Sequence, residues 1–528
     1  MGLNKNKKSY FIYILCAYLT VLAVGIYVLN TRHAKNLEVD SYNAEGKQRA
    51  GEIGNANFFN KADGKYYEDS RFTIEANDNT EYLTRLFNSE NTVNLPAGNF
   101  FCKSKIILKG MNLTVQGVKG STKIVFDSRT FSNYGQGYLS ECLIINSNYA
   151  DEFNETTAQK MKISDISFEY KRYTNRSPKT IMILKNIRRA DILNCDFIAD
   201  LSNTMPVTNL DLYNACKNVT VADCNFVNNT MALSGGCVWV RNLTTRLSAV
   251  ADNTTENVKI TDCNFEKDSK DEVIAVYSTV GNVRNVIINN CKIVDRFEKQ
   301  EIVLSVYSSE DKYYGTVDNI IISNNIIISD YFNAFIICTG IENRKKPTTN
   351  ISIYNNDINA QSVGTSSKTI IYNPAGNEKS NIYAINNRIT LTGNGYCNAI
   401  SNVSSAEGNV ISGQFRYGIT GGAAINNTIQ GAESAVVSPV VALRNTISDV
   451  KYGIRSFANN SYIGGNTVDI SELSGFCAIE LNSQARIYCA NNNIRTHDSS
   501  QYAIIGKGAN IILDNNDLAG EGKMIASK

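Results

Sequence analysis

One short pattern of apolar and polar positions recurs along most of this chain. An alternating apolar segment runs into a polar corner that is followed by one more apolar residue, as in VIINNCKI (286–293), IISNNII (321–327) and IYNNDI (353–358). Alternation with a period of two is typical of a β-strand that buries one face. The chain is therefore expected to fold as a long series of short strands separated by turns.

The copies align on one column of corner residues, spaced 18 to 39 residues apart: Ile166, Cys195, Cys224, Cys263, Cys291, Asn325, Asn356, Asn387, Asn409, Asn427, Asn445, Asn466, Asn492 and Asn516. Units repeated in this way bury their apolar faces only against the neighbouring copy, which defines a solenoid. Strands rich in Val, Ile and Asn, without helical periodicity between them, favour a parallel β-solenoid. Asn suits the corner because it tolerates the left-handed conformation, and because its amide can bond to the copies on both sides.

The cysteines of this column have two interpretations. Four of the thirteen cysteines lie in it, and neighbours on adjacent coils would come within the Cα separation that a disulfide permits. Stacked free thiols, acting as small apolar side chains, are the favoured interpretation. No CxxC or Cys/His spacing points to a zinc site.

Composition narrows the functional classes. The 528 residues carry 52 basic and 50 acidic side chains, and a net charge of +2 gives no case for a nucleic-acid partner. Only two histidines, His33 and His497, are present, which argues against a His-rich metal site and against a His base. No cofactor is predicted, and no motif supports a Ca²⁺ site. Nothing in the sequence indicates an oligomeric state.

The amino-terminal region predicts a membrane anchor. Residues 1–9 form a polar tail, and residues 10–29 contain no charge over a length that spans a bilayer as a helix. A cleaved signal peptide is the alternative, but no A-x-A site follows. Lysines in the tail would remain in the cytoplasm, which places the rest of the chain in the periplasm or extracellular space as a single-pass protein of the cytoplasmic membrane. Residues 30–70 are interpreted as a linker, and residues 71–528 as the β-helix domain.

A short amphipathic helix is expected before the first strands. Asp78, Asn79 and Thr80 are good N-cap residues, and Tyr82, Leu83, Leu86 and Phe87 follow at helical spacing. Such a helix would cap the open end of the solenoid, where the core and the strand edges would otherwise be exposed.

The segments after this helix carry a family resemblance. NTVNLPAGNF (91–100), IIL (106–108) and LTVQG (113–117) resemble the first strands of the pectate-lyase-like superfamily of right-handed β-helix proteins, and with the repeats the resemblance covers about residues 72–518. It implies an all-β, right-handed parallel β-helix. It assigns no activity, since this fold hosts lyases, hydrolases, epimerases, phage spikes and non-catalytic proteins. Motifs that resemble those of polygalacturonases (GHG, RIK) or mannuronan epimerases (DPHD) are absent.

A second repeated strand contains the candidate chemistry. Its copies read MILK (182–185), LDLY (210–213), VWVR (238–241), IAVY (274–277) and LSVY (304–307), with FIIC (335–338) as a continuation. Because strand residues alternate between faces, the second and fourth of each set should point outward. The outward columns then form an exposed stripe of aromatic and basic residues, with the only tryptophan, Trp239, at its centre. An extended sugar chain needs such flat rings and cations.

Two catalytic hypotheses and one structural interpretation remain open. The candidate substrate-binding residues are Lys185, Tyr213, Trp239, Tyr307 and Asp271, and the candidate catalytic residues are Asp211, Arg241, Glu272 and Tyr277. In a lyase, Arg241 or Lys185 would neutralise a uronate carboxylate while Tyr213 or Tyr277 removes the α-proton. In a hydrolase, Asp211 would pair with Glu272 or Asp271 as acid and base. The same residues can also simply decorate the outer face of a sheet, where Tyr is favoured.

The sequence therefore predicts a membrane-anchored, extracytoplasmic β-helix protein with a polysaccharide as its partner. It would act on an envelope or exported polysaccharide as a lyase, hydrolase or epimerase. The alternative is a non-catalytic glycan-binding or scaffold protein of polysaccharide assembly or export. An adhesin is less favoured because repeated surface motifs and wall-anchor modules are missing.

Overall fold

The structure is a computed structural model. It describes residues 56–60, 65–69, 78–102, 104–109, 112–127, 141–145, 158–171, 180–199, 207–229, 235–242, 254–269, 271–279, 281–297, 302–308, 315–332, 335–340, 348–362, 368–374, 381–393, 396–458, 460–482, 486–507 and 510–527. These residues all belong to one compact unit, made of Asn55–Asp69 and Ile74–Lys528. The expected tail (1–9) and membrane segment (10–29) lie outside the described residues. Within those residues, no helix has the length and apolar character needed to cross a membrane.

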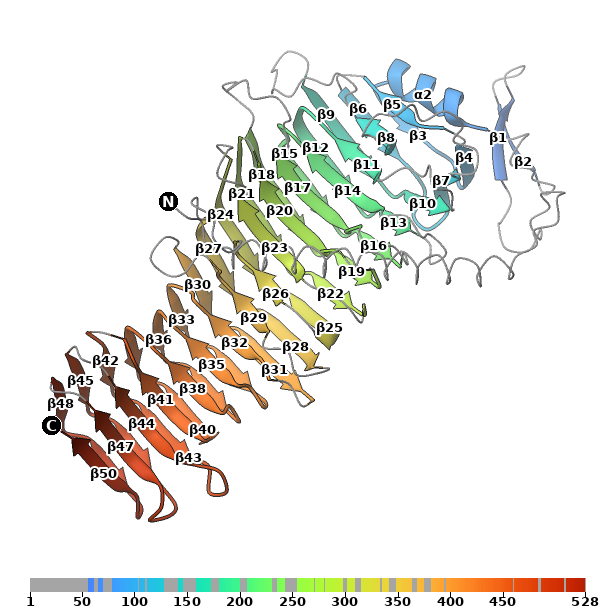
Figure 1. Ribbon diagram of the computed structural model, residues 1–528. Helices are drawn as coiled ribbons and strands as arrows, with labels where there is room; N and C mark the ends of the chain where they lie inside the picture. The colour runs from blue at the N-terminus through green and yellow to red at the C-terminus, as the bar shows by residue number, and fades with distance from the viewer. Residues whose placement is uncertain are drawn as a thin grey trace, which may run out of the picture. The chain divides into compact units, whose positions relative to one another are not determined.

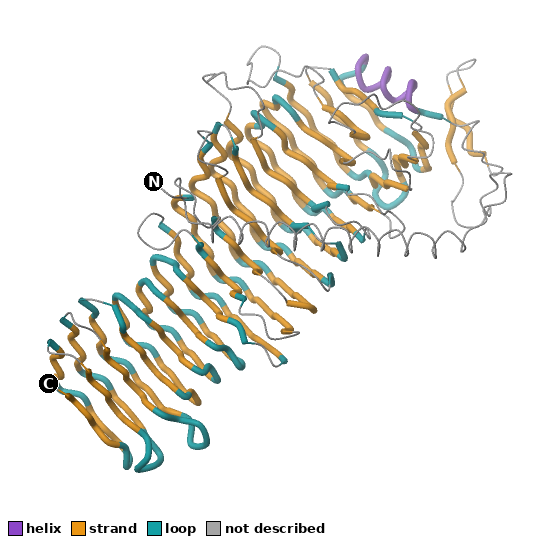
Figure 2. The backbone as a smooth tube through the Cα atoms, viewed as in Figure 1, coloured by secondary structure: helices purple, strands orange, loops and turns teal. Residues whose placement is uncertain are grey.

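The described chain is an all-β, right-handed parallel β-helix whose coils each contribute one strand to three parallel sheets (Figures 1 and 2). Sheet A contains β4 (Gly98–Cys102), β7 (Thr122–Asp127), β10 (Ser167–Lys171), β13 (Asp196–Ala199), β16 (Asn225–Asn228), β19 (Asn264–Lys267), β22 (Lys292–Asp295), β25 (Ile326–Phe332), β28 (Asp357–Ser362), β31 (Arg388–Thr392), β34 (Val410–Ser412), β37 (Thr428–Gln430), β40 (Thr446–Val450), β43 (Thr467–Ile470), β46 (Asn493–Arg495) and β49 (Asp517–Ala519).

Sheets B and C are built in the same way, with every third strand paired in parallel. Sheet B contains β3 (Thr92–Asn94), β6 (Asn112–Gln116), β9 (Gln159–Ser164), β12 (Ile187–Leu193), β15 (Lys217–Ala222), β18 (Thr254–Thr261), β21 (Asn282–Asn289), β24 (Thr316–Ser323), β27 (Thr349–Tyr354), β30 (Ile382–Ile385), β33 (Ser405–Glu407), β36 (Ala423–Ile425), β39 (Val441–Leu443), β42 (Tyr462–Gly464), β45 (Ile487–Ala490) and β48 (Ile511–Asp514). Sheet C contains β5 (Ile106–Leu108), β8 (Glu141–Ile145), β11 (Thr180–Leu184), β14 (Thr208–Tyr213), β17 (Val238–Asn242), β20 (Ile274–Ser278), β23 (Ile302–Ser308), β26 (Phe335–Cys338), β29 (Thr369–Tyr372), β32 (Asn398–Ser401), β35 (Tyr417–Thr420), β38 (Ser434–Val437), β41 (Tyr452–Ser456), β44 (Cys477–Asn482), β47 (Tyr502–Lys507) and β50 (Lys523–Ser527).

The helix expected before the first coil is α2 (Thr80–Ser89). The Asp78 carboxylate accepts hydrogen bonds from the backbone N–H and the hydroxyl of Thr80, at 3.0 and 2.6 Å. Leu83 and Phe87 are buried in the same core as the first strands, as a cap requires. Two further strands, β1 (Ala56–Asn60) and β2 (Lys65–Asp69), form an antiparallel hairpin within the range interpreted as a linker, and Ala56 pairs in parallel with Asn99 of β4.

The repeated corner is the spine of the solenoid. From Asn325 to Asn516 each buried Asn donates its Nδ2–H to Oδ1 of the Asn on the next coil, at 2.8–3.0 Å. The residue before each column member, rather than the member itself, adopts positive φ, as Asn324, Asn355 and Asn386 do. The two properties expected of one Asn are thus divided between two neighbours: one makes the turn and the other joins the coils.

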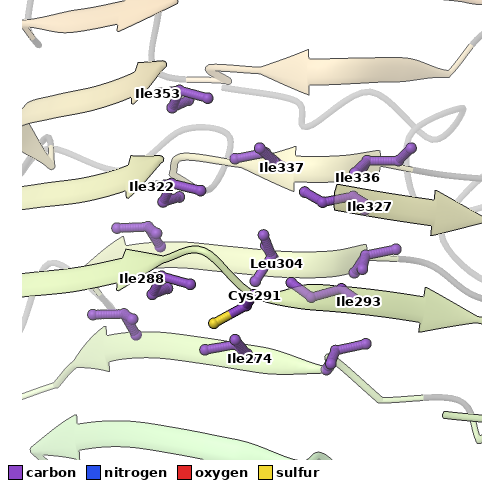
Figure 3. Packing of buried hydrophobic residues seen from close by; sticks show 14 of the residues in the cluster. Ile274, Ile288, Cys291, Ile293, Leu304, Ile322, Ile327, Ile336, Ile337 and Ile353 are labelled. Carbon is purple, nitrogen blue, oxygen red and sulfur yellow. The ribbon is translucent and has the colours of Figure 1, made fainter. Parts of the chain in front are cut away.

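The interior is a continuous apolar column. Four phenylalanines of sheet A (Phe168, Phe197, Phe226 and Phe265) stack with ring centroids 4.9–5.3 Å apart. Figure 3 shows the sulfur of Cys291 among Ile274, Ile288 and Ile293, in the position of a small apolar side chain. All twelve cysteines of the described chain are buried and carry free thiols, which agrees with the favoured interpretation of the cysteine column.

Candidate functional site

The candidate residues lie on sheet C, where β14, β17, β20 and β23 run side by side (Figure 1). Strand pairing places Tyr213, Arg241, Tyr277 and Tyr307 in one column, and Asp211, Trp239, Ala275 and Ser305 in another. The alignment of these four strands predicted from the sequence is therefore confirmed. The expected continuation at 335–338 is displaced by two residues, since Leu304 pairs with Ile337. The aromatic column consequently ends at Tyr307.

Arg241 is the centre of the hydrogen bonds in this region. Its Nε donates to both carboxylate oxygens of Asp211, at 2.9 and 3.1 Å, and its Nη2 also bonds to that carboxylate. Its Nη1 donates to the Tyr277 hydroxyl at 2.6 Å. One guanidinium thus links three coils.

Aromatic rings surround this guanidinium. Its central carbon lies 4.5 Å from the ring centre of Trp239, 5.1 Å from that of Tyr213 and 5.8 Å from that of Tyr277. The Lys185 ammonium lies 4.9 Å from the Tyr213 ring centre. The rings of Tyr277 and Tyr307 stack at 5.0 Å. The result is a row of ring faces along the solenoid, tied together by cation–π contacts.

The predicted stripe is less exposed than expected. Asp211 is completely buried and Lys185 is 5% exposed, while Trp239, Tyr213, Tyr277 and Tyr307 are half-buried. The expectation that Asp211 and Lys185 lie at an exposed surface is therefore wrong. The physical reason for Asp211 is its pairing with Arg241, which compensates the buried carboxylate. Asp211 can orient Arg241, but it cannot touch a ligand while that pair is intact.

The pairing keeps the Arg241 guanidinium charged. Burial alone would lower the pKa of the Arg241 guanidinium, but the Asp211 charge and the Tyr277 hydroxyl outweigh burial and raise it. Burial raises the pKa of Tyr277 to about 12, against the opposing effect of Arg241. Tyr277 is therefore a neutral phenol near neutral pH, and a poor base for removing a proton from carbon.

Asp271 and Glu272 form a second centre immediately before β20. The backbone N–H of Gly235 donates to Oδ2 of Asp271 at 2.9 Å. Burial, and then the charge and hydrogen bond of Asp271, raise the pKa of Glu272 to about 7. The charge of Glu272 in turn raises the pKa of Tyr307, after burial has done so. Glu272 therefore keeps its proton up to near neutral pH, and its charge acts on the tyrosine column.

Gly236 lets the tryptophan approach this pair. A Cβ atom at Gly236 would lie 2.4 Å from Nε1 of Trp239 and 2.5 Å from the carbonyl oxygen of Glu272, so no larger residue fits between them. The Trp239 Nε1–H is buried, and it has no hydrogen-bond partner in the described part of the chain. Glycine thus places the indole next to the backbone that carries Glu272.

A buried polar group lies behind the carboxyl pair, inside the solenoid. Lys267 is fully buried and donates to the carbonyl of Ser269, and Asp295 is its neighbour in the strand register of the next coil. Burial lowers the pKa of Lys267, while Asp295, Cys237, Asp271 and Glu272 oppose that shift. Burial raises the pKa of Asp295 to about 7. This internal lysine was not predicted, although it follows the inward-facing Cys263 and Phe265 with a period of two.

His497 lies in the turn after β46, beside two carboxylates. Its Nε2 lies 2.7 Å from Oδ1 of Asp469, and its Nδ1 lies 3.5 Å from Oε1 of Glu472. In the part of the chain that the structure describes, no three His, Cys, Asp or Glu side chains are arranged to hold a metal ion.

The known proteins that this chain is similar to share its fold and little of its sequence. No protein-family model and no curated protein matches the chain. One similar structure is a tailspike protein mutant of an E. coli bacteriophage in complex with a pentasaccharide (14% identity, TM-score 0.44, 84% of this chain and 75% of the other). Others are a family 28 exopolygalacturonase of Yersinia enterocolitica (10%, 0.40, 86% and 80%) and a mannuronan C-5 epimerase A-module of Azotobacter vinelandii (12%, 0.32, 85% and 95%). Likeness at this level carries no information about the reaction of this chain.

Proposed function

We propose that this protein binds a polysaccharide along the outer face of sheet C and hydrolyses it with the Asp271–Glu272 pair as the proton donor. The observation that carries the proposal is the position of this pair beside the row of Trp239, Tyr277 and Tyr307. Ring faces of this kind stack on the apolar faces of sugar rings. A carboxyl group with a pKa near 7 is suited to donate a proton to a leaving oxygen.

In the proposed reaction, the proton of the Glu272 carboxyl moves to the glycosidic oxygen while the bond from that oxygen to the anomeric carbon breaks. A water molecule adds its oxygen to the anomeric carbon and returns a proton to the pair. Glu272 serves as the acid, and Asp271 acts on it through its charge and a side-chain hydrogen bond, both of which raise the pKa of Glu272.

Hydrolysis is favoured over β-elimination by the state of Arg241 and Tyr277. A lyase needs a cation free to meet the uronate carboxylate and a base near the α-proton. Arg241 is already paired with Asp211, and Tyr277 is a neutral phenol with a raised pKa. Arg241 is instead assigned to hold Tyr277 in the ring column.

A non-catalytic glycan-binding protein is the second candidate. The pairing of Arg241 with Asp211 favours this candidate too. A row of rings that is held rigid by such pairs can recognise a sugar chain without reacting with it. We also propose that residues 10–29 anchor the chain in the cytoplasmic membrane with the β-helix outside the cytoplasm. The support for the anchor is the uncharged length of this segment and the lysines that precede it.

The proposal is tested by incubating the part of the chain from residue 31 with a panel of neutral and uronate polysaccharides. Hydrolysis produces new reducing ends without the ultraviolet absorbance of unsaturated uronates. Glu272→Gln should remove the activity and retain binding. Unsaturated products would contradict the hydrolase, and binding without any product would leave the second candidate. The absence of both binding and products across the panel would refute a glycan function.

A further inference from the structure

We infer that a second groove, on coils far from the Asp271–Glu272 pair, binds another segment of the same sugar chain. The groove has a volume of about 770 Å³ and lies over the turns that precede β32, β35, β38, β41 and β44. Its volume is within the range of small-molecule sites, roughly 300–1,000 Å³. This inference rests on the proposed function only for the class of its ligand.

The lining combines aromatic, aliphatic and charged side chains. Tyr396 is 47% exposed and Leu473 is 99% exposed, so both present apolar surface to solvent at the groove. The Arg416 guanidinium lies 4.9 Å from the ring centre of Tyr396 and 4.7 Å from that of Tyr417. The rings are thus held in place by a cation, as they are around Arg241.

The charges of the lining balance. Arg416 and Lys451 are matched by Glu433 and Asp449. Side chains of both signs offer hydrogen-bond donors and acceptors to hydroxyl groups, but they give no net attraction for an anion. Aromatic faces with balanced polar groups fit a neutral sugar segment better than a uronate or a phosphate.

Strand register places this groove on the same face as the first site. Pairing through sheet C connects Ile274 stepwise to Leu304, Ile337, Ile371, Ile400, Ile419, Val436 and Ile454. Glu272 lies two residues before Ile274, and Tyr417 lies two residues before Ile419. The carboxyl pair and the groove therefore occupy the same turn of the coil, between sheets A and C.

The distance between the two sites follows from the coil spacing. Ile400, in the coil of Tyr396, lies four coils from Ile274, and Ile479, in the coil of Ser474, lies eight coils away, which corresponds to about 19–38 Å at ~4.8 Å per coil. One sugar chain lying along the solenoid axis could occupy both sites. Linked binding of this kind raises affinity by roughly 10²–10⁴-fold over either site alone. The groove would therefore select long chains over short oligosaccharides.

The sole tryptophan makes the two sites separable by experiment. Trp239 fluorescence reports the first site, while the second groove contains only tyrosine and phenylalanine rings. The probe is an array of neutral and uronate glycans in graded chain lengths, followed by titration with the best-bound chain. Tyr396→Ala changes an exposed position of the groove, and Lys451→Gln changes a half-buried one. Tyr462→Ala, an exposed ring that stacks on Tyr488 at 5.2 Å on sheet B, is the matched control.

In the groove variants we expect the affinity for long chains to fall at least about tenfold. The fluorescence response to short oligosaccharides should be unchanged, and Tyr462→Ala should behave as the wild type. Equal affinity for long chains in all four proteins would overturn the inference. Self-association of the wild type that Leu473→Asp abolishes would also overturn it, because the groove would then be a contact between copies. If the groove variants weaken the binding of long chains but Trp239 fluorescence of the wild type does not respond to any sugar, only the first site would be refuted.

Discussion

A carboxylate removed from water stays charged only where a cation meets it, and Asp211 satisfies this condition through three bonds to Arg241. The same cation holds the hydroxyl of Tyr277. Asp211, Arg241 and Tyr277 thus form a rigid support for the surrounding rings. The charges of Asp211 and Arg241 are paired with each other.

Asp211→Asn is expected to destabilise the fold by about 3 kcal/mol, because Arg241 would lose its counter-charge while only 13% of its side chain is exposed. Urea unfolding of the soluble part measures the change. Glu266→Gln is the control, since its partner Arg296 is 49% exposed and surface pairs contribute about 0–1 kcal/mol. Equal effects of the two substitutions would show that the Asp211 pair is not a structural support.

The raised pKa of Glu272 predicts how kcat depends on pH. A raised pKa keeps the carboxyl group protonated below about 7 and ionised above it. If Glu272 donates the proton, kcat should be constant in mildly acidic solution and fall as the pH rises through about 7. Asp271→Asn removes the neighbouring charge and hydrogen bond, so it should shift this fall to lower pH. A profile that is identical in Asp271→Asn would contradict the role of the pair.

For single residues, the outward columns were predicted correctly from the sequence, because alternation fixes the face of each strand residue. It did not distinguish an outward residue that is exposed from one that is covered. Asp211 and Trp239 share a column, yet only the first is completely buried. The difference lies in side-chain pairing between coils, for which a single strand contains no signal.

Among the elements, the Asn corner makes the strongest joint between coils. Asn427 accepts hydrogen bonds from the backbone and the side chain of Asn409, and it donates to Ala406 and Asn445. The coils nearer the N-terminus contain Cys in this column. There each thiol lies against backbone carbonyl oxygens, whereas each Asn also bonds to the next Asn. The ladder therefore begins where the column changes from Cys291 to Asn325.

Asn427→Ala should destabilise the fold by about 3 kcal/mol or more, since it leaves several buried donors and acceptors without partners. Asn225→Ala is the matched control. Asn225 also donates to one neighbouring coil and accepts from the other, but its ladder is exposed to solvent. We expect a loss below about 1 kcal/mol for the control, measured by urea unfolding. A similar loss for both would contradict the buried ladder as the source of stability.

The elements were largely predictable because a repeat supplies many copies of the same evidence. The corner column was found in this way, whereas the capping helix Thr80–Ser89 was found from its N-cap residues and its helical spacing. The hairpin of β1 and β2 was not, since two strands outside the repeat have no second copy to align with. The two-residue displacement at Phe335 arose for a related reason: apolar residues on both faces leave the register of FIIC undetermined.

For the whole molecule, we propose that one face of the solenoid is a surface for a sugar chain. The first site and the second groove both lie on the turn between sheets A and C. The first site was marked in the sequence by its aromatic and basic outward column, whereas the basic and acidic side chains of the second groove balance. The groove was missed because residues from five coils form it, and no two of these residues share a recognisable motif.

The most direct test of the central claim is the affinity for the best-bound polysaccharide of wild type, Trp239→Ala and Tyr462→Ala, measured by calorimetry. Circular dichroism checks that each variant is folded. We expect Trp239→Ala to weaken binding at least about tenfold, because truncating an aromatic residue at the centre of a binding surface costs about 2 kcal/mol. Tyr462→Ala, on sheet B, should bind as tightly as the wild type. Unchanged affinity in Trp239→Ala, or an equal loss in Tyr462→Ala, would contradict the central claim.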